Sequence, residues 1–184
     1  MSTPLVSVVI PTRNRAQDIV EALKIVRTQD YPNLEIIIVN DGSTDNTKDV
    51  LNEQQGIVVV HNPERLWIQK SLNIGCKLAK GKYIARLDDH DIWTDVSKIA
   101  KQVEILESNP QIGVIGTAIK IGNRTIINPL TDRAIRNQRL FRYSFSHVTI
   151  VMRRDLLEKV GGYDESLKYS EDWDLWMKMG RYAE

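Results

Sequence analysis

The fold is decided by the stretch Leu34-Glu35-Ile36-Ile37-Ile38-Val39-Asn40, which is mostly apolar and rich in β-branched residues. A run of this kind is typical of a strand that is covered on both faces, as in a parallel sheet. A second apolar run, Val6 to Ile10, lies upstream, and Ile19, Leu23 and Val26 recur between the two runs at helical spacing. The N-terminal segment therefore predicts a strand, a helix and a parallel strand.

The same alternation continues along the chain. Apolar periodicity and turn residues predict further helices and strands in alternation, at residues 47–54, 57–61, 67–80, 83–87, 97–108 and 112–121. Helices of this length between strands imply right-handed crossovers. We therefore expect an α/β fold of the Rossmann type, with a mostly parallel sheet and helices on both faces.

The pattern changes after Asn123. Short apolar pieces at 125–128 and 147–152 flank the basic stretch Asp132 to Arg142, which predicts a mixed second half with a helix and antiparallel or irregular strands. Another helical pattern starts near Asp172 and runs to the end of the chain. Because no linker-like or repeated segment divides the sequence, we expect one domain over residues 1–184, truncated at its C-terminal end.

Composition excludes several classes of function. The 184 residues include 25 Lys and Arg against 24 Asp and Glu, so the formal net charge is +1 and no overall field attracts nucleic acid. The single cysteine, Cys76, excludes an intramolecular disulfide framework and a cysteine-based zinc site. No apolar run approaches the ~20 residues of a transmembrane helix. We expect a cytoplasmic protein with no transmembrane segment and no nucleic-acid partner.

Acidic residues follow the predicted strands, at the carboxyl ends where open α/β sheets bind ligands. Asp41 begins a segment that fits a turn and helix cap as well as a binding site. The stretch Asp88-Asp89-His90-Asp91 is more specific, because three carboxylates and an imidazole repel one another unless a cation or hydrogen bonds compensate. Divalent cations prefer carboxylate oxygen, and a cation bound there would attract a diphosphate.

The common phosphate-binding loops are missing from this sequence. Pro11-Thr12-Arg13-Asn14-Arg15 stands after the first strand, where a P-loop or a glycine-rich dinucleotide loop would lie. This excludes ordinary kinases and dehydrogenases. Phosphate charge must then be met by the metal and by basic side chains, for which the candidates are Arg13, Arg15, Arg65 and Lys70.

Seven motifs occur in order along nearly the whole chain. They are Val6-Ser7-Val8-Val9-Ile10-Pro11-Thr12-Arg13-Asn14-Arg15, Ile38-Val39-Asn40-Asp41-Gly42-Ser43-Thr44-Asp45, Asn73-x-Gly75, Gly81-Lys82-Tyr83-Ile84, Leu87-Asp88-Asp89-His90-Asp91-Ile92-Trp93, Gly161-Gly162-Tyr163-Asp164 and Glu171-Asp172-Trp173-Asp174-Leu175-Trp176. In this order they resemble the motifs of the family 2 glycosyltransferases. The resemblance implies a GT-A fold, a nucleotide-diphosphate sugar donor, a divalent metal and transfer with inversion at the anomeric carbon.

The resemblance also assigns residues to the nucleotide site. Pro11, Thr12 and Asp41 match positions that hold the base and ribose. Asp88 matches the first aspartate of the family's D-x-D motif. Among the basic candidates, we assign Arg15 to the nucleotide site.

The metal site departs from the family pattern. The third position of D-x-D, usually a metal-binding aspartate, is His90, and Asp91 matches a further common aspartate. The resulting D-x-H is similar to the variant of mucin-type polypeptide sugar transferases, in which imidazole holds manganese. We predict that Asp88, His90 and Asp91 bind a divalent metal, with Mn²⁺ favoured over Mg²⁺. The alternative is that His90 faces solvent and Asp89 or Asp91 replaces it.

The resemblance implies a catalytic role for the last motif. Asp172 matches the family's catalytic base, with Glu171 beside it. A base at this position would accept the proton of the acceptor hydroxyl as that oxygen attacks the anomeric carbon. Trp173 and Trp176 are expected to line a pocket or to raise the pKa of a neighbouring carboxylate.

We therefore predict an inverting hexosyl- or related glycosyltransferase that moves a sugar from a nucleotide-diphosphate sugar, with UDP favoured, to an acceptor hydroxyl. The acceptor is expected to be a saccharide or a lipid-linked saccharide in polysaccharide biosynthesis for the cell envelope, with peripheral contact at the inner face of the membrane. The main alternative is a non-catalytic or incomplete nucleotide-sugar- or carbohydrate-binding domain, because His90 replaces an aspartate. A nucleotidyltransferase is the second alternative, but it normally carries a glycine-rich basic loop after the first strand.

Overall fold

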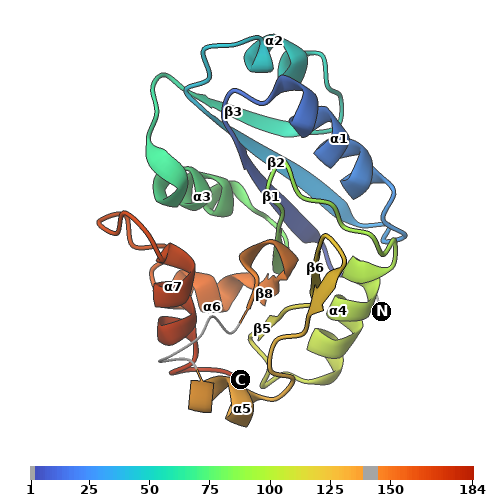
Figure 1. Ribbon diagram of the computed structural model, residues 1–184, viewed down its shortest axis with the longest axis vertical. Coiled ribbons are helices and arrows are strands. Elements are labelled where there is room, and N and C mark those ends of the chain that lie inside the picture. Colours follow the sequence, from blue (N-terminus) through green and yellow to red (C-terminus); the bar gives the residue numbers. More distant parts are fainter. Residues whose placement is uncertain (1–2, 139–144) are drawn as a thin grey trace.

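Six strands form one sheet in the order β3-β2-β1-β4-β8-β5 in the computed structural model, which describes residues 3–138 and 145–184 (Figure 1). Their bounds are β1 Val6–Thr12, β2 Leu34–Asp41, β3 Val58–Asn62, β4 Tyr83–Arg86, β5 Val114–Ile115 and β8 Val151–Arg153. Strands β1, β2, β3 and β4 run parallel to one another, and β8 runs antiparallel to both β4 and β5. The predicted α/β fold with a mostly parallel sheet is confirmed.

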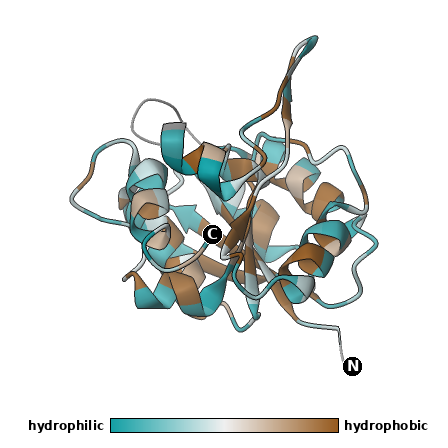
Figure 2. Ribbon diagram, turned by 90° about the horizontal axis from the view of Figure 1, so that it is seen from below, coloured by the Kyte–Doolittle hydropathy of each residue, from teal (hydrophilic) through white to brown (hydrophobic). Residues whose placement is uncertain are grey.

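Helices cover both faces of this sheet (Figure 2). Their bounds are α1 Ala16–Arg27, α2 Thr47–Asn52, α3 Trp67–Leu78, α4 Lys98–Ser108, α5 Asp132–Gln138, α6 Arg154–Lys159 and α7 Glu171–Met179, with a 3₁₀ turn at His147–Thr149. Val8 and Ile10 of β1 pack in the core with α1, α2 and α4, whereas Val9 between them packs with α3, α6 and α7. Because both faces are buried, most residues of β1 are apolar, and its two polar residues Ser7 and Thr12 hydrogen-bond Glu35 and Asp89.

Helix α3 packs closely against the sheet and holds the loop that contains Tyr163. A Cβ atom at Gly75 would lie 2.5 Å from Val9 Cγ1, so only glycine permits this approach without a shift of the valine. Two residues before it on α3, Asn73 accepts a hydrogen bond from the backbone N–H of Tyr163 and donates one to the Tyr163 carbonyl, each 2.9 Å long. The glycine motif at 161–164 is thereby held against α3.

The second half of the sheet differs from the predicted elements. The apolar stretch 112–121 does not form one strand, because β5 takes only its first part and β6 Ile119–Ile121 pairs with β7 Arg124–Ile126 in a separate hairpin. Strand β8 takes the place beside β4. Met152 of β8 is fully buried there, whereas Ile121 of the hairpin is 62% exposed, so apolar burial favours this arrangement.

Two helix predictions also need correction. The helix predicted at 67–80 ends at Leu78, because Glu35 Oε1 accepts hydrogen bonds from the backbone N–H groups of Lys80 and Gly81. Helix α6 was not predicted from the sequence. Helix α5 occupies the first part of the basic stretch, and residues 139–142 of that stretch lie outside the described ranges.

None of the helices within 3–138 and 145–184 combines the length and the apolar character that crossing a bilayer requires.

Candidate active site

The carboxyl ends of β1, β2 and β4 meet around a cavity of about 180 Å³. The residues predicted to bind the nucleotide all line it, namely Pro11, Thr12, Arg15, Asp41 and Asp88. They come together because neighbouring parallel strands end at the same edge of the sheet, although up to 77 positions separate them in the chain. Further lining residues are Arg13, Arg65, Trp67, Ile68, Ser71 and Asp89.

Asp41 forms one wall of this cavity and also holds the start of α3. Its Oδ1 accepts hydrogen bonds from the Leu66 backbone N–H at 2.7 Å and from Asn62 Nδ2 at 2.9 Å, and its Oδ2 accepts one from the Trp67 backbone N–H at 3.0 Å. The sequence left open whether the segment from Asp41 to Asp45 caps the helix that follows it or lines a site. The Asp41 carboxylate lines the cavity and bonds the start of α3, whereas Asp45 accepts hydrogen bonds from Thr47 at the start of α2.

The acidic loop after β4 gathers a set of possible metal ligands. Asp88, His90 and Asp91 each offer one ligand atom, and these atoms lie within 4.8 Å of one another. The pKa of Asp91 is raised, first by burial and then by the charge of Asp88. Two carboxylates and one imidazole form a donor set that suits a first-row transition metal ion, so the residues present fit the predicted Mn²⁺.

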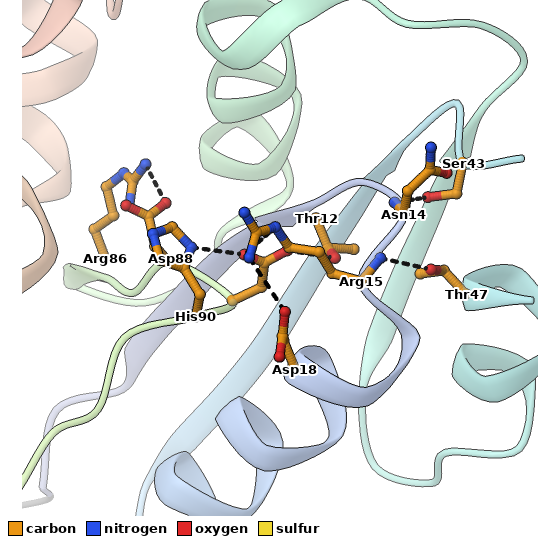
Figure 3. A network of polar contacts seen from close by, with 10 residues as sticks. Thr12, Asn14, Arg15, Asp18, Ser43, Thr47, Arg86, Asp88 and His90 are labelled. Carbon is orange, nitrogen blue, oxygen red and sulfur yellow. Dashed lines mark hydrogen bonds and ion pairs between the residues drawn. The ribbon is translucent and has the colours of Figure 1, made fainter. Parts of the chain in front are cut away.

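Asp89 is buried next to this cluster and contacts His90. It is 6% exposed, and its Oδ2 accepts a hydrogen bond of 2.7 Å from Thr12 Oγ1. Its Oδ1 lies 3.0 Å from His90 Nδ1 and 3.6 Å from Arg15 Nε (Figure 3). An imidazole whose Nδ1–H is donated to a carboxylate keeps its Nε2 lone pair for a metal, the arrangement found in many metal sites.

Arg86, at the end of β4, was not identified from the sequence. Its guanidinium is buried, and Nη2 lies 2.8 Å from Asp88 Oδ1 (Figure 3). Burial acts to lower the pKa of Arg86, but the charges of Asp88, Tyr163 and Glu171 outweigh it and raise the pKa. Within residues 3–138 and 145–184, its Nε and Nη1 atoms have no hydrogen-bond partner. The available signal was a charged residue inside a buried strand that leads into an acidic loop.

Glu171 and Asp172 stand in the first turn of α7, and the charge of Arg86 acts on both. Burial is the largest cause of the raised pKa of both carboxyl groups. The charge of Asp88 raises the pKa of Glu171 further, whereas Arg86 acts to lower the pKa of each. Arg86 therefore acts on both acids, and Asp88 of the loop after β4 acts on Glu171.

The two tryptophans of this motif differ in burial, because Trp173 is half-buried and Trp176 is buried. Trp176 is buried, with its ring centroid 5.4 Å from that of Phe145 and 5.7 Å from that of His147, so it belongs to the core between α7 and the sheet. His147 in turn hydrogen-bonds the Tyr163 hydroxyl through Nε2 at 2.8 Å. Trp176 thus packs in the core and lines a separate apolar pocket with Phe145 and Met179, away from the cavity at the strand ends.

Sequence comparisons place the chain among known proteins. The model of glycosyl transferase family 2 matches residues 7–161. An uncharacterized glycosyltransferase of Haemophilus influenzae is 35% identical, with 97% of this chain and 61% of that protein covered. Another, from Rickettsia prowazekii, is 33% identical, with 98% of this chain and 60% of that protein covered. The chain therefore spans about three fifths of the length of these relatives.

Solved structures extend the comparison. The mannosyltransferase PcManGT from Pyrobaculum calidifontis, in complex with GDP-Man and Mn²⁺, has a TM-score of 0.77 and 25% identity, covering 97% of this chain and 52% of its own. Residues 1–349 of TarS from S. aureus, in complex with UDP-GlcNAc, have a TM-score of 0.79 and 22% identity, covering 97% and 54%. These likenesses support the GT-A fold, and the family model matched over residues 7–161 shows that this chain belongs to glycosyl transferase family 2.

Proposed function

We propose that this chain transfers a sugar from a nucleotide-diphosphate sugar to an acceptor hydroxyl, with inversion at the anomeric carbon. One observation carries the proposal: the Asp88, His90 and Asp91 ligand atoms lie within 4.8 Å of one another beside the strand-end cavity. Glu171 interacts electrostatically with Asp88 of this cluster, and Asp172 interacts with the neighbouring Arg86. A cation-binding group beside a pair of partly buried carboxylic acids suits the departure of a diphosphate and the activation of a hydroxyl.

Asp88, His90 and Asp91 would hold the divalent cation, for which we favour Mn²⁺. The cation supplies positive charge that stabilises the departing diphosphate. Arg86 fixes one oxygen of Asp88 and leaves the other available for a ligand. Arg15, which lines the cavity, carries a second positive charge that can contact phosphate oxygens.

Asp172 is the proposed general base, and Glu171 is the alternative. Asp172 Oδ1 accepts a hydrogen bond of 2.8 Å from the Trp173 backbone N–H, which fixes the orientation of the Asp172 carboxylate. Burial raises the pKa of Asp172, and a more basic carboxylate is a better acceptor for the hydroxyl proton.

The substrates are proposed by class. UDP-sugar is favoured as donor, and the complexes of the structural relatives contain UDP-GlcNAc in one case and GDP-Man in the other. We propose a saccharide or lipid-linked saccharide as acceptor, in polysaccharide biosynthesis for the cell envelope. On this proposal the protein acts in the cytoplasm, in peripheral contact with the inner face of the membrane.

Calorimetry with UDP and GDP, each with and without Mn²⁺, tests the donor site. We expect Mn²⁺-dependent binding of one nucleotide, and loss of that dependence in Asp88→Asn. Absence of binding for both nucleotides would refute the proposal.

Release of nucleoside diphosphate from UDP-GlcNAc and GDP-mannose tests the chemistry. Asp172→Asn should lower the release rate by about 10²-fold while nucleotide binding is kept. Asp155→Asn is a matched control, because Asp155 also stands in a first helical turn and accepts the next backbone N–H at 2.8 Å. Binding without any release of diphosphate would favour the non-catalytic or incomplete domain.

A further inference from the structure

Trp67 has a backbone conformation that its residue type disfavours. Its φ is +72°, in the left-handed region that bulky side chains rarely adopt. Its side chain does not compensate by burial, because the residue remains 52% exposed. Glycine would take this conformation without strain. A strained and exposed aromatic residue at a site edge points to a role in binding rather than in stability.

The loop that carries Trp67 is rigidly attached to the end of β2. Asp41 accepts hydrogen bonds from the backbone N–H groups of both Leu66 and Trp67. The neighbouring Gly42, at φ +62°, lies so close that a Cβ there would be 2.4 Å from the Glu64 carbonyl carbon. These contacts fix the backbone at the left-handed position, so the indole is presented in one place.

Arg65 completes the surface. Its guanidinium carbon lies 3.6 Å from the centroid of the Trp67 ring, a stacked cation–π arrangement. Both residues line the same cavity as Asp41 and Asp88. The pair therefore adds an aromatic face and a positive charge to the wall of the proposed donor site.

The sheet decides which part of the donor would meet this surface. β1 lies between β2 and β4, so the ends that carry Asp41 and Asp88 are two strand spacings apart, about 10 Å. The diphosphate belongs at the Asp88 end, where the metal ligands gather. The transferred sugar belongs beside Asp172. The remaining end of an extended nucleotide sugar, its nucleobase, then falls at the Asp41 end.

We propose that Trp67, with Arg65 stacked on it, binds the nucleobase of the donor by ring stacking and so determines nucleotide affinity. This inference rests on the proposed function and adds two residues to its site. Stacking of a base on an aromatic side chain is tolerant of base identity, so Trp67 would strengthen the binding of uridine and guanosine nucleotides alike.

Trp67→Gly separates binding from stability. Relief of the left-handed strain should keep the melting temperature within about 3 °C of the parent or raise it. Nucleotide affinity should fall by roughly tenfold or more. Trp67→Phe, which retains an aromatic ring, should lose less nucleotide affinity than Trp67→Gly. Tyr182→Ala is the control, because Tyr182 is similarly exposed at 56% and also carries a stacked cation, Lys159 Nζ at 4.1 Å.

Three probes assign the effect to the base. Calorimetry is carried out with UDP, GDP and inorganic pyrophosphate, each with Mn²⁺. We expect Trp67→Gly to weaken the binding of both nucleotides and to leave the affinity for pyrophosphate unchanged. Equal affinity of parent and Trp67→Gly for UDP and GDP would overturn the inference, as would equal weakening of pyrophosphate. If the parent binds neither nucleotide, the proposed function itself has failed.

Discussion

The Arg86 guanidinium lies 2.8 Å from the Asp88 carboxylate and is itself buried beneath the acidic loop. A buried cation at this place orients the first carboxylate of the metal-ligand cluster and offsets part of its charge. Five carboxyl groups approach this region, from Asp88, Asp89, Asp91, Glu171 and Asp172. Arg86 is therefore a positioning residue for the proposed metal site.

Substituting Arg86 tests this role. Arg86→Lys keeps the charge but loses the planar guanidinium, so Asp88 should lose its fixed orientation. We expect Mn²⁺-dependent UDP binding to weaken by about 10- to 100-fold in calorimetry. Arg153→Lys is the control, because Arg153 is a half-buried arginine on the neighbouring β8 that bonds backbone carbonyls away from the cavity. Parent-like binding by Arg86→Lys would show that Asp88 is oriented without it.

The metal preference is expected to depend on His90. His90→Asp converts the cluster to carboxylates alone and adds one negative charge, so Mg²⁺ should support donor binding nearly as well as Mn²⁺. His90→Ala should lose metal-dependent binding. Nucleotide titrations in each metal measure both effects, with His61→Ala as a histidine control outside the cluster. If His90→Ala binds donor and Mn²⁺ as the parent does, the ligands are the neighbouring aspartates.

The pH dependence of turnover is expected to follow Asp172. Its pKa in the folded protein is raised above the usual 3.8, chiefly by burial, so the acidic fall in kcat/KM should lie above that pH. Between the usual and the raised pKa the folded chain holds more protons than the unfolded chain, so stability declines as pH rises through this window. Asp172→Asn should therefore melt at a higher temperature than the parent at pH 7 while losing turnover. A lower melting temperature would contradict the assigned environment.

Lys98 should govern the stability of the fold at alkaline pH. Burial lowers the pKa of Lys98 to about 7, and its Nζ lies 2.7 Å from Gln102 Oε1 and 4.1 Å from the Trp93 ring centroid. Between pH 7 and the usual pKa of 10.5 the unfolded chain holds a proton that the folded chain lacks, so stability rises with pH in this range.

Denaturant unfolding from pH 7 to pH 10 measures this slope. Lys98→Met should flatten it and raise stability at pH 7, because no charge is then buried. Lys101→Met, at an exposed position on the same helix, should leave the slope as in the parent. A slope that persists in Lys98→Met would assign it to other groups.

The sequence alone determined the layered fold and indicated that the candidate site lies at the carboxyl ends of the strands. The β-branched runs of β1 and β2 and the apolar stripe of the helix between them are local patterns. The spacing of apolar residues along the chain is enough to distinguish a strand buried on both faces from a helix buried on one. The acidic loop at Asp88 follows directly from the end of a buried strand. Family motifs then allowed the residues around it to be named before any contact was known.

Only the tertiary structure decided how these residues act on one another. Thr12 bonds Asp89 across 77 positions, and β8, from the second half of the chain, pairs with β4, where its apolar side chains are buried. The left-handed backbone of Trp67 likewise depends on Asp41, 26 positions away. Such contacts between distant segments leave no periodic trace in the sequence, because their geometry exists only once the sheet has assembled.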